Sequence, residues 1–409
     1  MSLKLIKIGD LGEVITGNTP PKKDPENYGG DYPFIKPTDM DIDKKYVTEW
    51  DETYSEKAYN KYHRAYIPPG ATGVVTIGTV GEKLFQAHQH CFTNQSVNVI
   101  IPNDNYYDDY VFYLMKLNLP KVENANPGTA SGRHHVSKSN FCSIKVDVVE
   151  CLNSQKRIAD ILSAYDDLIE NNLKRIKLLE QAAQNIYKEW FVNLRFPGHE
   201  NTAINEETGL PEGWEYGVVS DLCEVKSGYA FKSKQWKKKG NPVIKIKNIN
   251  NNTVSLNDTG FVDDEVAQNA KKYELFSGDV IIAMTGATVG KVGLIPKIDK
   301  RIYLNQRVGL FRPLLEENNN IALVFSFFLT DDSQQQVLNF AQGAAQPNIS
   351  GSEIGNIKLN IADSKVLSEF NKLTKPSIDL IQTLYGQNQK LKAARDILLP
   401  RLMNRTIEV

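Results

Sequence analysis

The sequence has few of the features that mark secreted, membrane or metal-binding proteins. Its 409 residues include only four cysteines, Cys91, Cys142, Cys151 and Cys223, with no CxxC spacing, so neither a disulfide framework nor a zinc site is indicated. The longest nearly apolar run, residues 321–329, is far too short to span a membrane. The first residues lack the apolar core of a signal peptide. We therefore expect a cytoplasmic protein that contacts no membrane.

The chain also lacks an excess of either charge. Lys and Arg number 48 and Asp and Glu number 49, which gives a net charge of −1 at pH 7. A chain that binds nucleic acid by itself usually has a strongly basic surface. Any attraction to phosphate must therefore be local or shared with a partner.

Motifs for catalysis are missing as well. We find no Ser/His/Asp or Cys/His arrangement, no glycine-rich dinucleotide turn and no Asn-Pro-Pro-Tyr run of the kind that amino-methyltransferases use. Thr285–Lys291 is only superficially like a phosphate-binding loop, because Val292 stands where Ser or Thr would hold magnesium. A tight turn is the better interpretation. The histidines of 88–90 and 134–135 have no acid or cysteine at ligand spacing. We predict that this chain holds no catalytic residue, no metal and no cofactor.

Two long heptad patterns are present instead. Residues 154–191 have apolar residues at coiled-coil spacing, and at about 1.5 Å per residue this helix would be roughly 50 Å long. Residues 366–402 repeat the pattern 212 residues later. Pro376 should kink or start this second helix. The predicted seam consists of Ile158, Leu162, Tyr165, Ile169, Asn172, Ile176, Leu179, Ile186, Trp190, Phe370, Ile381, Leu384, Asn388, Leu391, Leu398 and Leu402.

The two helices should pair with each other in antiparallel orientation. If partner numbers sum to 560, each seam residue acquires one partner. The layers include Ile158–Leu402, Tyr165–Arg395, Ile176–Leu384 and Trp190–Phe370. Asn172 then meets Asn388, and an Asn–Asn pair satisfies both amides and fixes the register.

The globular parts repeat along with the helices. Short matching segments recur about 210 residues apart, between stretches that differ strongly. They are 11–14 with 222–225, 33–36 with 242–245, 79–81 with 288–290, 94–95 with 305–306, and 136–137 with 349–350. We therefore predict an α+β fold, with two globular domains in tandem repeat separated by two long antiparallel coiled-coil helices in pseudo-two-fold symmetry.

Most of the candidate nucleic-acid contacts lie in the parts that differ. Residues 225–257 carry eight lysines, three aromatic residues and no acid, a composition that suits phosphate contact, although an ordinary solvated face is the alternative. Residues able to donate to phosphates or base edges occur in both halves. The predicted DNA-binding set is Lys22, Lys23, Lys36, Lys83, Gln86, His88, Arg133, His134, His135, Lys232, Lys234, Lys237, Lys238, Lys239, Lys245, Lys247, Lys291, Arg307, Gln346 and Asn348.

Several segments together resemble one known family. They are Gly9–Pro20, Pro25–Gly30, Gln155–Leu162, Trp190-Phe191, Leu210–Trp214 and Asp396–Leu402. In combination they resemble the specificity (S) subunits of type I restriction-modification systems, over nearly the whole chain.

The resemblance implies a division of labour. Residues 1–152 and 214–364 would be target-recognition domains, 153–191 and 365–403 the conserved spacer helices, 192–213 a linker and 404–409 a tail. Each domain would read one half of a bipartite, asymmetric site on double-stranded DNA, and the helices would set the separation. The partners implied are two modification subunits, which methylate adenine with S-adenosylmethionine, and two restriction subunits, which use ATP and Mg²⁺. The S subunit itself would be non-catalytic.

Other functions fit parts of the pattern. The chain could be a coiled-coil tether that touches no DNA, an enzyme with an unrecognised site, or the specificity subunit of another restriction-modification type. A tether would tolerate replacement of Lys237, Lys238 and Lys239 by Glu, and an enzyme would show turnover as an isolated chain.

Overall fold

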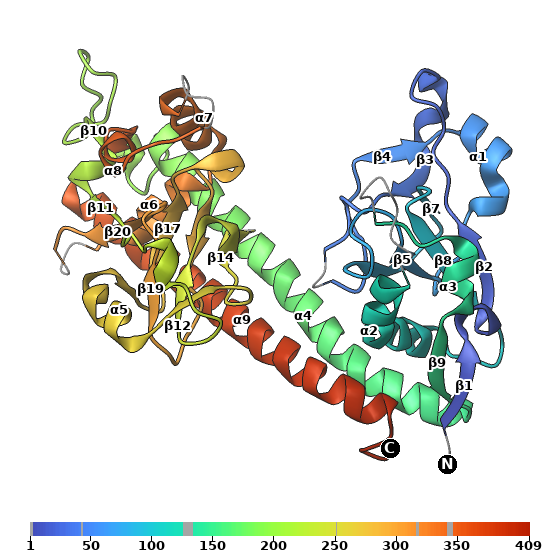
Figure 1. The fold of residues 1–409 in the computed structure, drawn as a ribbon. Coiled ribbons are helices and arrows are strands. Elements are labelled where there is room, and N and C mark those ends of the chain that lie inside the picture. The colour runs from blue at the N-terminus through green and yellow to red at the C-terminus, as the bar shows by residue number, and fades with distance from the viewer. Residues whose placement is uncertain (1–2, 42–43, 126–133, 251, 316–318, 342–346) are drawn as a thin grey trace. The chain divides into compact units, whose positions relative to one another are not determined.

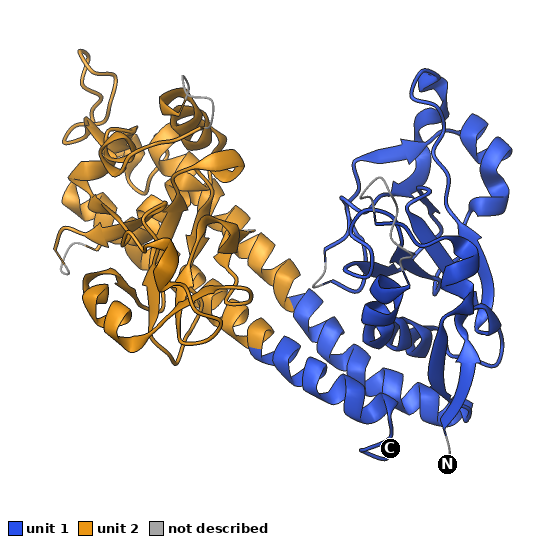
Figure 2. Ribbon diagram, in the orientation of Figure 1, with its two compact units in different colours: residues 1–171, 390–409 blue, residues 172–389 orange. Residues whose placement is uncertain are grey.

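The computed structural model describes residues 3–41, 44–125, 134–250, 252–315, 319–341 and 347–409. The chain forms two compact units, shown in separate colours in Figure 2. Unit 1 contains residues 1–171 and 390–409, and unit 2 contains residues 172–389. The division cuts the two longest helices, so each unit contains part of both. Within the described ranges, no helix is both long and apolar enough to cross a membrane.

Unit 1 is an α+β unit, and its described residues form three small sheets (Figure 1). Its strands are β1 (Leu3–Lys7), β2 (Gly12–Thr16), β3 (Tyr28–Ile35), β4 (Glu52–Tyr54), β5 (Thr72–Val75), β6 (Leu84–Gln86), β7 (Phe92–Thr93), β8 (Val97–Pro102) and β9 (Lys145–Val149). Its short helices are α1 (Glu56–Tyr62), α2 (Asp108–Asn124) and α3 (Lys138–Ser143). The sheet orders are β2-β8-β5-β6, β4-β3-β7 and β1-β9.

Unit 2 repeats this plan with additions. Its strands are β10 (Glu215–Val218), β11 (Cys223–Ser227), β12 (Asn241–Ile244), β13 (Ile249–Asn250), β14 (Thr253–Val254), β15 (Gly260–Val262), β16 (Glu274–Leu275), β17 (Val280–Ala283), β18 (Val292–Leu294), β19 (Ile302–Leu304), β20 (Val308–Pro313) and β21 (Lys358–Ile361). Its short helices are α5 (Asp264–Asn269), α6 (Ile321–Phe328), α7 (Asp331–Phe340) and α8 (Gly351–Gly355). The sheet orders are β11-β20-β17-β18-β14-β13, β15-β12-β19-β16 and β10-β21.

The predicted repeat is confirmed by which strands pair in each unit and by whether they run parallel or antiparallel. β3 pairs with β7 in parallel, Phe34 opposite Phe92, as β12 pairs with β19, Val243 opposite Tyr303. Likewise β1–β9 and β10–β21 are both antiparallel. The similar segments noted in the sequence therefore fold into the same framework twice.

The long helices are α4 (Leu152–Tyr187), followed by a π turn at Lys188–Val192, and α9 (Ser364–Met403). The predicted contact between the two asparagines is present: Asn172 Nδ2 donates to Asn388 Oδ1 at 2.9 Å. At one end of the pair, the Trp190 and Phe370 rings lie 5.6 Å apart. These contacts require the two helices to run antiparallel.

Pro376 does not start the second helix, although a proline is tolerated in the first turn of a helix. The α9 helix begins at Ser364, where Asp363 Oδ1 accepts from the backbone N–H of Lys365 and Val366, at 2.8 and 3.1 Å. This cap nucleates the helix well before the proline, and helical structure then continues past it.

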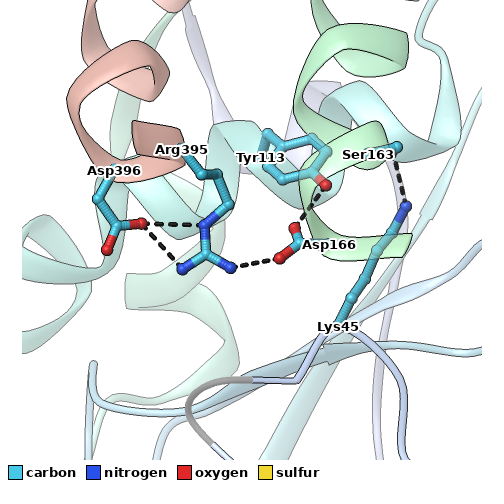
Figure 3. Close-up of polar contacts among 6 residues, drawn as sticks. All are labelled: Lys45, Tyr113, Ser163, Asp166, Arg395 and Asp396. Carbon is cyan, nitrogen blue, oxygen red and sulfur yellow. Dashed lines mark hydrogen bonds and ion pairs between the residues drawn. The ribbon is translucent and has the colours of Figure 1, made fainter. Parts of the chain in front are cut away.

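The layer that was expected to pair Tyr165 with Arg395 is built differently. Tyr165 is half-buried, and Arg395 instead forms an ion pair with Asp166, the next residue on α4. Tyr113 of α2 donates to the other carboxylate oxygen of Asp166 at 2.6 Å (Figure 3). The arginine is satisfied by the nearest carboxylate rather than by a phenol, because a buried charge needs a counter-charge.

Lys45 lies in the same part of unit 1 as the Asp166–Arg395 ion pair (Figure 3). Its ammonium group pairs with Asp109 at 2.8 Å and donates to Ser163 of α4 at 3.1 Å. Burial lowers the pKa of Lys45, but the charge and hydrogen bond of Asp109 together with the contribution of Tyr46 outweigh that effect, and the pKa is raised overall. Polar bonds thus tie the globular part of unit 1 to α4.

In unit 2 the corresponding polar contact is made by Glu180 of α4. Its carboxylate accepts from Asn252 Nδ2 and from the Tyr385 hydroxyl, both at 3.1 Å. Burial raises the pKa of Glu180 above its usual value of 4.5 despite these bonds.

This raised pKa predicts a pH effect on stability. The contribution of Glu180 to folding is fully present below its unfolded pKa and is lost as the pH rises through its folded pKa. Glu180→Gln, which cannot ionise, should therefore raise the stability of unit 2 relative to the parent chain at pH 7 and lose that advantage near pH 4. Urea unfolding at both pH values measures the difference. Glu206→Gln, at an exposed position in unit 2, is the control, and an equal effect of pH on all three proteins would contradict the prediction.

Candidate nucleic-acid interface

A cleft of about 790 Å³ lies in unit 2 where several strands end. It is lined by Ser227, Gly228, Tyr229, Ala230, Tyr273, Met284, Thr285, Gln306, Arg307, Pro347, Asn348, Ile349 and Ser350. Two of the predicted DNA-binding residues, Arg307 and Asn348, are thereby brought to one site. Both side chains are exposed. The cleft offers a fixed place where donors, acceptors and aromatic rings meet.

The wall of the cleft contains the turn that was compared with a phosphate-binding loop. Gly286 and Gly290 adopt φ values of +80° and +85°, and Gly78 and Gly81 of unit 1 adopt +87° and +72°. Positive φ is the conformation that glycine tolerates best. The motif is therefore a tight turn common to both units, as the sequence indicated.

The basic segment, which we define as residues 226–247, divides into paired and unpaired lysines. Lys226 pairs with Glu224, Lys237 with Asp263 and Lys247 with Asp258. Two of these acids, Asp258 and Asp263, lie beyond the acid-free sequence window. Neutralisation by acids from neighbouring turns was not visible from composition alone.

Four lysines of the basic segment stay available. The ammonium groups of Lys232, Lys234, Lys238 and Lys239 form no ion pair or side-chain hydrogen bond within the described part of the chain, and all four are exposed. They give unit 2 a local positive charge that the net charge of the chain conceals.

The aromatic residues of this segment pack internally. Phe231 is buried with Val243 and Val262, and the Phe231 and Trp236 rings lie 5.4 Å apart. Lys245 Nζ lies 3.6 Å from the centre of the Trp236 ring, and burial lowers its pKa. Phe231 therefore completes a small core, and its ring is not exposed for contact with DNA.

Several predicted residues of unit 1 are engaged in structure. Lys36 lies 3.4 Å from a carboxylate oxygen of Glu52, and Lys83 donates to the Pro37 carbonyl at 2.9 Å. Gln86 is buried, and its amide donates to the Gly70 carbonyl at 3.3 Å. In this conformation Gln86 cannot reach a base edge.

The other predicted positions are at the surface. Exposed side chains are found at Lys22, Lys23, His88, His134, His135 and Lys291. Arg133 and Gln346 lie outside the described residues.

Each unit also has a pair of basic residues that composition and spacing did not reveal. His63 and Arg64 form a short turn after α1, and Lys271 and Lys272 form the matching turn after α5. All four side chains are exposed. Aligning the two halves through the helices that precede these turns would have revealed the match.

Comparison with known proteins agrees with this picture. The sequence profile of the type I restriction modification DNA specificity domain matches residues 3–181 and again 211–385. The type I restriction enzyme MjaIX specificity subunit of Methanocaldococcus jannaschii is 26% identical over 405 residues, covering 97% of this chain and 91% of that protein. The MjaVIII specificity subunit of the same organism is 25% identical and covers 99% and 93%.

A solved structure has the same fold. The S subunit of a type I restriction-modification system from M. genitalium superposes with a TM-score of 0.57 at 16% identity, covering 98% of this chain and 96% of that one. At this identity the likeness concerns the fold.

Proposed function

This chain belongs to the type I restriction-modification DNA specificity family, and from that premise we propose that it is the subunit that selects the DNA sequence for a type I restriction-modification complex. The observation that carries the proposal is the double match of the specificity domain to a chain whose two units share one framework. Each domain would read one half of a bipartite site, and the strong differences between the halves make that site asymmetric.

The two long helices would act as the spacer. Their antiparallel contacts, such as Asn172 with Asn388, support an antiparallel coiled-coil with pseudo-two-fold symmetry. A helix of roughly 50 Å corresponds to about 15 base pairs, an upper bound on the separation of the half-sites. The outer faces of the helices would dock the modification subunits.

Catalysis would belong to the partners. In this proposal two modification subunits supply S-adenosylmethionine chemistry, two restriction subunits supply ATP and Mg²⁺ chemistry, and this chain contributes double-stranded DNA recognition. In this proposal each target-recognition domain, with the limits predicted from the sequence (1–152 and 214–364), reads one half-site.

The test is binding by the assembled methyltransferase. The recognition sequence is first obtained by mapping methylated adenines in host DNA with and without the gene. We expect tight binding only to duplexes that contain both half-sites at the native spacing, with a loss of about 1000-fold or more when one half is scrambled. Equal binding to fully scrambled DNA would contradict the proposal.

A further inference from the structure

In each unit, an asparagine side chain fixes one backbone position by the same kind of hydrogen bond. Asn94 Oδ1 accepts from the backbone N–H of Ser96 at 3.0 Å in unit 1. Asn305 Oδ1 accepts from the backbone N–H of Arg307 at 3.3 Å in unit 2. Residues 96 and 307 therefore occupy the same place in the repeated framework.

Backbone hydrogen bonds next to these positions also match between the two units. Gly17 N donates to Val97 O, and Gly228 N donates to Val308 O, both at 3.1 Å. Gly78 N donates to His134 O at 3.0 Å, and Gly286 N donates to Pro347 O at 2.9 Å. The backbone around the unit 2 cleft is thus built to the same pattern as the corresponding part of unit 1.

The side chains on this common backbone differ. Asn18, Ser96 and His135 of unit 1 stand where unit 2 has Tyr229, Arg307 and Asn348. A kept backbone with changed side chains is expected where two domains of one design read different sequences.

Polar groups in the unit 2 cleft have unused bonding capacity. The Arg307 guanidinium makes no ion pair or hydrogen bond with any described residue, and its side chain is exposed. Thr285 Oγ1 is buried in the cleft wall and has no partner within the described ranges. A buried polar atom without a partner is costly unless a ligand supplies one.

The chemistry of the lining favours a base over a phosphate. Arg307 is the single charged residue among the described residues that line the cleft, and its neighbours include Tyr229, Gln306 and Asn348. Affinity for phosphates comes mainly from several lysines and arginines that neutralise their charge. A base edge is matched by one planar donor fork, amides and rings.

We infer that Arg307 reads a guanine in the half-site of unit 2, with Tyr229 and Asn348 shaping the rest of the cleft. This inference rests on the proposed function. The guanidinium would donate to O6 and N7 in the major groove, which is the pairing that arginine geometry fits best. Arg307 is then a specificity-determining residue.

The test compares three variants in the complex with the modification subunits. Selection from randomised duplexes first defines the wild-type site. Arg307→Gln should reduce the preference for guanine at one position of one half-site by roughly 10- to 100-fold and leave the other half-site unchanged. Arg307→Lys, which keeps the charge but not the planar fork, should also weaken that preference. Arg301→Gln, at another exposed arginine of unit 2, should preserve the wild-type site.

Two results would overturn the inference. Arg307→Gln could weaken binding to all sequences equally, with Arg307→Lys restoring it, which is the behaviour of a phosphate contact. Arg307→Gln could also leave the selected site intact. By contrast, a wild-type complex that selects no sequence at all would refute the proposed function itself, so the two failures are distinguishable. Melting curves of all variants verify that they remain folded.

Discussion

Replacing Lys234, Lys238 and Lys239 together with glutamine is expected to lower the affinity of the assembled complex for its DNA site by about 100-fold near 0.15 M salt. These lysines are exposed and unpaired within the described part of the chain, whereas Lys237 and Lys247 already have acidic partners. Each lysine that neutralises a phosphate releases counterions, and the gain is lost when the charge is removed. Glutamine keeps the length and polarity of the side chain and so isolates the charge.

The salt dependence provides the sharper measurement. The plot of log K against log salt concentration should become shallower by about 3, because each contact contributes about 0.9 to its slope. The matched control replaces three exposed lysines elsewhere in unit 2, Lys297, Lys300 and Lys358, with glutamine. If this control reduced the affinity and the slope as much as the test variant, the basic segment would be an ordinary solvated face.

The sequence predicted those parts of the fold that depend on periodicity. Heptad spacing placed Asn172 against Asn388 and Trp190 against Phe370, because apolar residues on one face of a long helix have few alternative partners. The repeat was also predictable, because short matching segments mark the turns and strand ends of one framework.

Details that depend on tertiary contacts were not predictable. The acids that neutralise Lys237 and Lys247 follow the acid-free window and reach those lysines only after β15 and its neighbouring turns have folded. The burial of Gln86 follows from its place on β6, whose residues are all buried. Neither the acidic partners of these lysines nor the burial of Gln86 can be predicted from composition or spacing. The predicted DNA-binding residues therefore include both exposed side chains and side chains that are held within the fold.

A second large effect is expected at the buried ion pair of unit 1. The side chains of Asp166 and Arg395 are each only 3% exposed, and Tyr113 donates to the same carboxylate (Figure 3). Burial opposes the charge on Arg395, but Asp166 and Asp396 together outweigh it and raise the pKa of the guanidinium. Arg395→Met keeps much of the volume and leaves Asp166 charged without a counter-ion. We expect a loss of about 3–5 kcal/mol in the free energy of unfolding of unit 1.

A rescue experiment distinguishes an unpaired charge from lost packing. Positions 212 residues from Asp166 and Arg395 are occupied in unit 2 by Ile378 and Ala183, which are buried and apolar. The triple variant Tyr113→Phe, Asp166→Leu, Arg395→Met removes the hydroxyl, the carboxylate and the guanidinium of this cluster together. It should therefore recover most of the stability lost in Arg395→Met.

Calorimetry and hydrogen exchange of unit 1 peptides in the full chain measure these effects. At about 2–4 °C per kcal/mol, the single variant should lower the unit 1 transition by roughly 10 °C. Asp396→Ala is the control, because Asp396 is 58% exposed and an exposed partner contributes only about 1 kcal/mol or less. If the triple variant were as unstable as Arg395→Met, packing of the arginine side chain rather than its charge would hold this layer together. If Arg395→Met were as stable as the parent chain, the ion pair would contribute nothing to the attachment of unit 1 to its helices.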